Sequence, residues 1–198
     1  MARPREFDET KVLEAAMNCF WARGFEHTSV RDLAERMGIT GASLYNAFGD
    51  KRSLYRQAFV YYLAQTVRQR VVRLEKLPAG LAIRAFFDEI IERSVDDEQR
   101  RGCMLVNAAL ELAPYDPEFQ KLVAEEMVFI EAFFCRCIEA GQKDGSIADI
   151  PPPDELAKLL LSVLLGIRVL ARTRPQREVL EGAANGVLAL LGKESKTF

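Results

Sequence analysis

The chain has 198 residues, of which 49% are hydrophobic and 28% are charged, a balance typical of globular proteins with a sizeable core. No apolar run approaches the roughly 18 residues needed to span a bilayer, and no apolar segment follows the basic N-terminus as in a signal peptide. The sequence therefore predicts a cytoplasmic protein without a membrane partner. The net charge of −2 hides an asymmetry, because residues 1–73 hold 12 Lys and Arg against 8 Asp and Glu, whereas residues 74–198 hold 15 against 21. A positive N-terminal part suits a polyanionic partner.

The first predicted helix begins after a basic arm. Residues 1–7 contain two arginines, and two interpretations remain open: an unstructured terminus, or an arm that contacts phosphate or the minor groove. Asp8 is a good N-cap for a helix that extends to about Arg23, and Gly24 ends it. We expect Phe25 to fold back as a hydrophobic plug.

Two short helices joined by a tight turn are predicted within residues 29–48. Ser29 followed by Asp32 has the spacing of a capping box, Gly38 can take the left-handed conformation that closes a helix, and Thr40 is a good cap for the second helix. The outer face of that second helix would carry small and polar side chains, without carboxylates that a phosphate backbone would repel. This pattern is typical of a helix-turn-helix, whose second helix enters the major groove of DNA.

A series of short motifs carries a family resemblance. They are A-R-G-F (Ala22–Phe25), T-S-V-R-D-L-A (Thr28–Ala34), M-G-I-T (Met37–Thr40), S-L-Y (Ser43–Tyr45), Phe48, and D-K-x-x-L-Y (Asp50–Tyr55). In this order and spacing, residues 8–59 resemble the DNA-binding domain of the TetR family of bacterial transcriptional regulators. The resemblance implies an all-α protein of about nine helices with a C-terminal ligand-binding and dimerisation domain. Leu77 to Gly80 would break the chain, so we divide it into a head (1–50), a linking helix (51–76) and a body (77–198).

The resemblance also implies DNA contacts at matching positions. Ser29, Arg31 and Lys51 correspond to phosphate contacts, and Tyr45 corresponds to an aromatic side chain that lies against the DNA backbone or a thymine methyl. The remaining implied DNA-binding residues lie in the second helix or cap it: Thr40, Gly41, Ala42, Ser43, Asn46 and Ala47.

Two of these positions depart from the family. Gly41 and Ala47 stand where many members have longer side chains that can reach base edges. Bidentate contacts of such side chains contribute about 1–3 kcal/mol of discrimination each. Either Asn46 and the small residues allow a close approach of the helix, or more of the specificity comes from DNA shape.

The linking helix and five body helices follow. The arginines of the linking helix, at positions 68, 70 and 73, are predicted to form a solvated face. The body helices are predicted over residues 81–93, 102–112, 119–143, 155–173 and 176–191.

The most informative stretch of the body is G-C-M-L-V-N-A-A-L-E-L, residues 102–112. Cys103, Asn107 and Glu111 form a polar line at i, i+4 and i+8 of an otherwise apolar helix. The line is either the polar rim of a ligand pocket, or a reactive thiol with its neighbours, or a set of groups that bind nearby backbone and arginines beside a buried cysteine. Glu111 on such a rim favours a neutral or cationic ligand unless Arg168 or another cation turns inward. The predicted ligand-binding residues are Phe86, Cys103, Met104, Asn107, Glu111 and Met127.

The last two helices are the candidates for self-association. The run from Leu159 to Leu170 is apolar nearly all round, and the final helix is rich in small residues, so both need cover on two sides. In the TetR family these helices form a four-helix dimer interface; the alternative is burial within the monomer. Two copies would place two recognition helices one turn of DNA apart, on a palindromic operator.

Residues typical of enzyme sites are scarce. His27 is the only histidine, the four cysteines lack metal-ligand spacing, and no glycine-rich phosphate loop is present. The sequence thus predicts no catalytic residue, no metal and no cofactor. It favours a homodimeric repressor that binds double-stranded DNA and is released by a small-molecule effector. The alternatives are a thiol-based redox or electrophile sensor that uses Cys103, and a regulator without a small-molecule ligand.

Overall fold

The computed structural model describes residues 8–149 and 151–192, so the arm expected within residues 1–7 lies outside the described residues. Within these ranges the chain forms nine helices and no strand, which confirms the all-α prediction. They are α1 (Glu9–Arg23), α2 (Val30–Met37), α3 (Gly41–Phe48), the continuous linking helix made of α4 (Lys51–Leu63), a π-helical segment (Ala64–Arg68) and α5 (Gln69–Leu74), then α6 (Ala79–Val95), α7 (Met104–Glu111), α8 (Pro117–Asp144), α9 (Pro153–Thr173) and α10 (Arg177–Leu188). None of the helices described is long and apolar enough to cross a bilayer.

The helices of the head begin and end where local chemistry predicts. Asp8 accepts hydrogen bonds from the backbone N–H groups of residues 10 and 11, at 3.1 and 3.3 Å. Ser29 and Asp32 form the predicted capping box, and Gly38 takes the left-handed conformation with φ of 66°. Thr40 caps α3 by accepting from the N–H of Ser43 at 3.1 Å. These predictions are confirmed. Each could be made from the sequence because the cap depends only on residues close in sequence.

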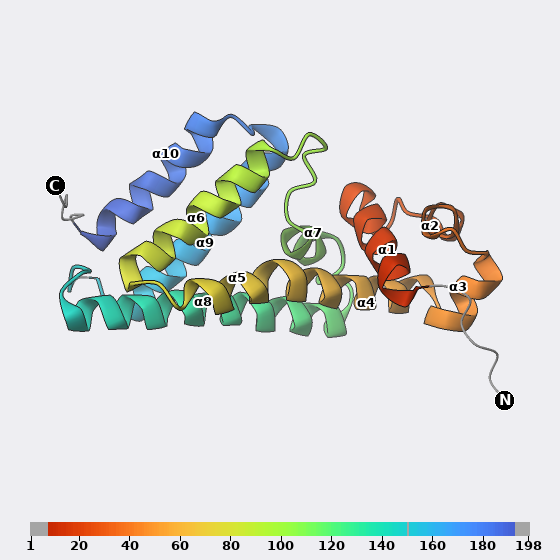
Figure 1. The fold of residues 1–198 in the computed structure, drawn as a ribbon, viewed down its shortest axis with the longest axis horizontal. Helices are drawn as coiled ribbons and strands as arrows, with labels where there is room; N and C mark the ends of the chain where they lie inside the picture. The colour runs from red at the N-terminus through yellow and green to blue at the C-terminus, as the bar shows by residue number, and fades with distance from the viewer. Residues whose placement is uncertain (1–7, 150, 193–198) are drawn as a thin grey trace.

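The linking helix runs from beneath the head to the far end of the body (Figure 1). Helix α8 lies alongside it in the same direction, and α6, α9 and α10 pack together at the body end. Ion pairs in ascending order along both helices join the linking helix to α8, among them Arg52–Asp116, Arg68–Glu126 and Glu75–Arg136. Helix α7 lies between head and body.

An aromatic cluster crosses the junction of head and body. Tyr55 of the linking helix packs against Phe20 and Phe25 of the head, with ring centroids 4.9 and 5.2 Å apart. It also packs against Phe119 of α8 at 5.4 Å, and Phe119 lies 6.1 Å from Phe59. The predicted plug at Phe25 is thus part of a core shared by head, linking helix and body.

The prediction of a solvated arginine face is wrong for Arg70. Its side chain is only 5% exposed; its Nε donates to Glu89 of α6 at 3.0 Å and Nη1 donates to the carbonyl of Thr66 at 3.0 Å. Burial lowers the pKa of Arg70, and the bond to Glu89 opposes this shift. A π turn holds more residues than an α turn, so the segment that precedes Arg70 rotates it away from the position a regular helix would give.

Replacing Phe119 by Ala should lower the free energy of unfolding by about 3–5 kcal/mol, because a fully buried ring of the shared core would leave a cavity. Chemical denaturation followed by circular dichroism measures this change. Val128→Ala is the control, because Val128 lies on the same helix and is 64% exposed. It should change the free energy of unfolding by less than about 0.5 kcal/mol. Equal effects of the two substitutions would contradict a shared core at Phe119.

Candidate DNA-binding surface and ligand cavity

Helix α3 presents an uncharged face to solvent. Leu44 and Phe48 are 0% and 4% exposed and hold the helix to the head core, as predicted. On the other side Tyr45 is 51% exposed and Asn46 is also exposed. The predicted residues Thr40 and Ala42 are exposed, whereas Gly41, Ser43 and Ala47 are half-buried. The face could therefore approach a base-pair edge without repelling phosphates.

The predicted phosphate contacts, Ser29, Arg31 and Lys51, differ in their exposure and in the contacts that they already make. Arg31 is exposed near the start of α2. The hydroxyl of Ser29 already accepts from the N–H of Asp32 at 3.1 Å and donates to its carboxylate, so this side chain primarily orders the start of α2. Lys51 is half-buried, with its Nζ 4.3 Å from the centroid of the Phe25 ring, which leaves the ammonium at the head surface.

An ion pair fixes α2 against α1. Arg23 at the end of α1 donates to Asp32 at 2.7 Å. The hydrogen bonds from Ser29, followed by that from Arg23, lower the pKa of Asp32 to about 2. The helix-turn-helix is thereby oriented relative to the first helix of the head.

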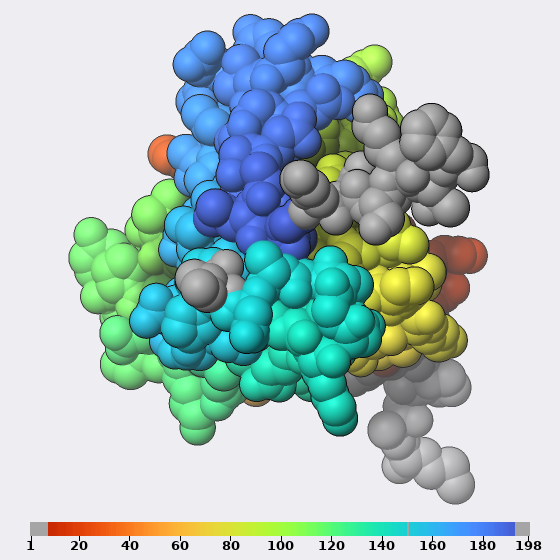
Figure 2. All heavy atoms as spheres, turned by 90° about the vertical axis from the view of Figure 1, so that its left-hand side faces the viewer, coloured from red at the N-terminus to blue at the C-terminus, as the bar shows by residue number. Residues whose placement is uncertain are grey.

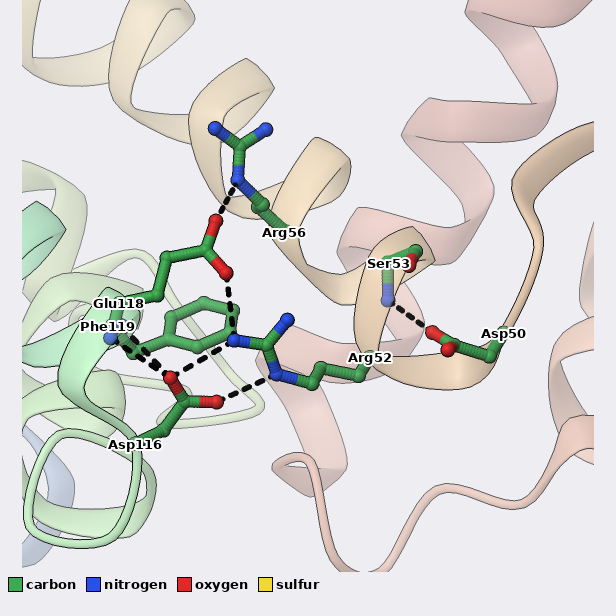
Figure 3. A network of polar contacts seen from close by, with 7 residues as sticks. All are labelled: Asp50, Arg52, Ser53, Arg56, Asp116, Glu118 and Phe119. Carbon is green, nitrogen blue, oxygen red and sulfur yellow. Dashed lines mark hydrogen bonds and ion pairs between the residues drawn. The ribbon is translucent and has the colours of Figure 1, made fainter.

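A second polar network fixes the linking helix to the start of α8 (Figure 3). Arg52 donates to both carboxylate oxygens of Asp116, at 2.6 and 2.9 Å, and its Nη2 also donates to Glu118 at 2.7 Å. Arg56 donates to the other oxygen of Glu118 at 2.6 Å. Asp116 also caps α8 by accepting from the N–H of Phe119 at 3.3 Å. The bonds from Arg52 are the main cause that lowers the pKa of Asp116 to about 2.

Glu111 joins head and body through the backbone rather than through a ligand pocket. Its Oε2 accepts from the N–H of Phe25 at 2.9 Å, directly after the end of α1. Gly24 has φ of 81°, and a Cβ there would lie 2.7 Å from both carboxylate oxygens. The close approach of the carboxylate therefore requires glycine at position 24.

The predicted polar line of α7 does not face a single pocket. Asn107 receives a hydrogen bond from Arg172 at 3.0 Å and donates to the carbonyl of Arg101 at 3.2 Å. Because α7 is short and lies between head and body, the two ends of the line meet different elements. Asn107 and Glu111 thus follow the interpretation in which they bind backbone and arginine.

A cavity of about 520 Å³ lies where α1, the linking helix and the body meet. Trp21 of α1, Tyr62 of the linking helix and Phe86 of α6 contribute to its wall. Of the predicted ligand-binding residues, Phe86 and Cys103 line it, whereas Met104, Asn107, Glu111 and Met127 do not. A volume of this size is in the range of small-molecule sites.

Polar groups of the cavity wall converge near Cys103. The hydroxyl of Tyr62 donates to Cys103 Sγ at 3.6 Å, and burial raises the pKa of Tyr62. The indole of Trp21 donates to the carbonyl of Gly102 at 3.3 Å. Arg168 of α9 donates to the same carbonyl and to Ser94 Oγ, the latter at 2.6 Å.

Sequence reasoning missed several cavity residues. Trp21, Tyr62 and Arg70 belong to segments interpreted as head or linking helix, and only the tertiary arrangement brings them to the cavity. Arg168 offered a signal, since it is the single charged residue in the apolar run 159–170. Within the described ranges, no group of three or more His, Cys, Asp or Glu side chains could hold a metal.

Comparison with known families gives two matches in chain order. Residues 12–58 match the model described as bacterial regulatory proteins, tetR family, and residues 80–187 match the one described as tetracyclin repressor-like, C-terminal domain. Among curated relatives, the HTH-type transcriptional regulator YezE of Bacillus subtilis is 32% identical over 197 residues, with 96% of this chain and all of YezE covered. The HTH-type transcriptional repressor ComR of Escherichia coli is 26% identical over 190 residues, with 95% and 90% covered.

Solved structures show the same fold. A cysteine mutant of the TetR family transcriptional regulator CifR, complexed with 26-bp double-strand operator DNA, superposes with a TM-score of 0.85. It is 34% identical, and the match covers 96% of this chain and all of the CifR chain. A TetR transcriptional regulator from Chloroflexus aurantiacus, 24% identical with a TM-score of 0.81 and 91% of each chain covered, has the same fold.

Glu111→Ala should accelerate hydrogen exchange at the Phe25 amide and lower the free energy of unfolding by about 1 kcal/mol, because a half-buried N–H loses its acceptor. Exchange measured by NMR reports the amide directly. Glu111→Gln keeps an acceptor and should retain most of the protection, and Leu110→Ala, at a 67% exposed neighbour, is the control. Unchanged exchange in Glu111→Ala would contradict the contact.

The Asp116 carboxylate predicts a pH dependence of stability. Its folded pKa of about 2 lies below the unfolded value of about 3.9, so the folded state is stabilised fully above about pH 4 and loses this contribution as pH falls toward 2. Urea unfolding midpoints of wild type and Asp116→Asn should therefore converge between pH 4 and 2, while wild type is more stable at pH 6. Parallel curves across this range would contradict the assignment.

Proposed function

The chain belongs to the TetR family of bacterial transcriptional regulators, and from that membership we propose that it acts in the cytoplasm as a homodimeric repressor released from a palindromic operator by a small molecule. The observation that carries the DNA-binding part is the exposed, uncharged face of α3 within an intact helix-turn-helix. The CifR complex, which contains operator DNA, supports the same use of this fold.

In the proposed complex, α3 enters the major groove. Arg31 and Lys51 lie beside α3 and would neutralise phosphates, and the affinity should fall steeply with salt. Asn46 can pair with an adenine edge through its amide, and Tyr45 can contact a thymine methyl or the backbone. The small side chains of α3 favour close approach, with DNA shape as a further source of specificity.

Dimerisation through α9 and α10 is supported by their exposed surface. Leu159 and Val169 of α9 are 42% and 47% exposed, and Leu190, just after α10, is 42% exposed. Gly182 and Gly186 of α10 are exposed, with open space where a Cβ would lie, which permits a close helix approach from a second copy. Helix α10 covers the upper part of the end face of the molecule, above the C-terminal end of α8 (Figure 2).

The composition of the cavity wall supports the proposed control by a ligand. The wall includes Trp21 of the head and Tyr62 of the linking helix as well as Phe86 of the body, so a ligand would contact all three parts. Two recognition helices bind DNA together only about 34–36 Å apart. A ligand that binds better to a conformation with another head spacing shifts the population away from DNA.

Two alternatives make different predictions. A thiol sensor at Cys103 is supported by the position of this sulfur in the cavity wall, beside the Tyr62 hydroxyl. A Cys103→Ser protein that still releases DNA on electrophile treatment would exclude it. A regulator without a ligand would need a filled core, and the cavity of about 520 Å³ argues against it.

Selection of bound sequences from a random DNA pool, with the mass in solution measured in parallel, tests the proposal. We expect a dimer and a palindromic site. Tyr45→Ala should weaken binding to that site by about tenfold or more, since an exposed aromatic contact is lost while the fold is kept. Tyr115→Ala, at an 86% exposed tyrosine in the turn before α8, is the matched control and should bind as wild type. No enriched site, or a monomer, would contradict the proposal.

A further inference from the structure

We propose that the effector is an organic carboxylate with an apolar body, whose carboxylate binds Arg168 inside the cavity. This inference rests on the proposed function, because it names the chemistry of the ligand that the cavity would take. The juxtaposition that carries it is a buried arginine in the wall of a cavity that has both polar and apolar sides. Among the residues that the structure describes, Arg168 has no carboxylate partner, and it donates to the Gly102 carbonyl, which also accepts from Trp21 of the head.

Arg168 is the unusual group of this cavity. It is 7% exposed and lines the cavity, and within residues 8–149 and 151–192 its guanidinium donates only to neutral acceptors, Ser94 Oγ and the carbonyl of Gly102. Its Nε–H has no acceptor among the residues that the structure describes. A buried charge without a counter-ion is costly, and a buried donor without an acceptor adds to that cost. An incoming carboxylate would supply both the charge and the acceptor.

The other buried cation of the wall already has a partner. Arg70 pairs with Glu89 at 3.0 Å, and Glu89 lies outside this cavity. Arg101 pairs with Asp97 at 3.0 Å. The other acidic residues of the cavity wall are exposed to solvent, Glu14 on α1 and Asp96 after α6. Arg93, the remaining cation of the wall, is exposed to solvent. Among the described residues of the wall, the buried positive charge without a carboxylate partner is therefore that of Arg168.

Buried apolar side chains in the same cavity favour a ligand with an apolar body. Phe86, Ile130 and Leu164 are 1%, 3% and 3% exposed and line the same cavity. The carboxylate that the sequence placed on the pocket rim, Glu111, instead binds the head backbone. Its absence from the cavity removes the repulsion that favoured a neutral or cationic ligand.

The same contacts connect ligand binding to the head. The Gly102 carbonyl accepts from Arg168 of the body and from the indole of Trp21 in α1, the latter at 3.3 Å. A carboxylate that draws the guanidinium toward itself would change the hydrogen bonding of this carbonyl and thus the contact with α1. Trp21 is the only tryptophan of the chain, so its fluorescence reports this event.

The test uses three probes of equal chain length and different charge: octanoate, octanamide and octylammonium. Titrations of the full-length protein are followed by Trp21 fluorescence and by calorimetry. We expect octanoate to bind about tenfold or more tightly than the other two, as a charged hydrogen bond to a buried group implies. Arg168→Gln should abolish this preference, whereas Arg168→Lys should retain part of it. Arg172→Gln, which removes the same charge one turn along α9 and outside the cavity, should keep the preference.

Each other outcome counts against the proposal. Tighter binding of the amide or the amine overturns it, as does a preference for octanoate that survives in Arg168→Gln. If Arg168→Gln does not fold, the three probes on wild type and Arg168→Lys still decide. No saturable binding of octanoate up to about 1 mM overturns it as well. Operator affinity measured with and without octanoate separates the two proposals. If octanoate binds but does not release DNA, only the proposed release mechanism is contradicted. If the protein binds its operator but not octanoate, only the proposal of a carboxylate effector is contradicted.

Discussion

The attachment of the head depends on a carboxylate that the body supplies to the backbone of the head. Glu111 accepts the N–H of Phe25, and this is possible only because Gly24 leaves room for the carboxylate. Arg52 and Asp116 form a second attachment, between the linking helix and α8. In the proposed dimer, recognition of two half-sites requires a defined spacing of the α3 helices, so these two junctions would determine whether its geometry fits DNA.

The cavity lies between these two junctions and the far end of the body. In the proposed mechanism, a ligand bound there would act on the junctions that position α3. Its wall includes the π-helical segment of the linking helix, and such segments often occur at functional sites. The Gly102 carbonyl, with its donors from α1 and α9, connects the buried arginine to the head. Burial of an unpaired guanidinium lowers the stability of the empty protein, and a bound anion would recover that stability.

What could be predicted from the sequence is what local chemistry decides. The capping box at Ser29, the turn at Gly38 and the core positions Leu44 and Phe48 depend on neighbours within a few residues, and the structure confirms them. Family membership confirms a regulator rather than an enzyme. The assignments of DNA-contacting and ligand-contacting residues stay predictions. The surroundings of α7 and the burial of Arg70 could not be predicted, because charged side chains are seldom buried and the tertiary arrangement decides which ones are. For Arg168, the single charge in an apolar run is a sequence signal for an inward orientation, but only the tertiary arrangement brings it to the cavity wall.

The contact between Glu111 and Phe25 also has a consequence for how the chain folds. The acceptor that completes the end of α1 comes 86 residues later in the sequence, so the head cannot reach its final hydrogen-bonded form until α7 has docked. The aromatic cluster of Tyr55 and Phe119 spans the same boundary. Head and body should therefore unfold together in one cooperative transition, and a fragment cut after the linking helix would expose apolar surface that normally belongs to the interior.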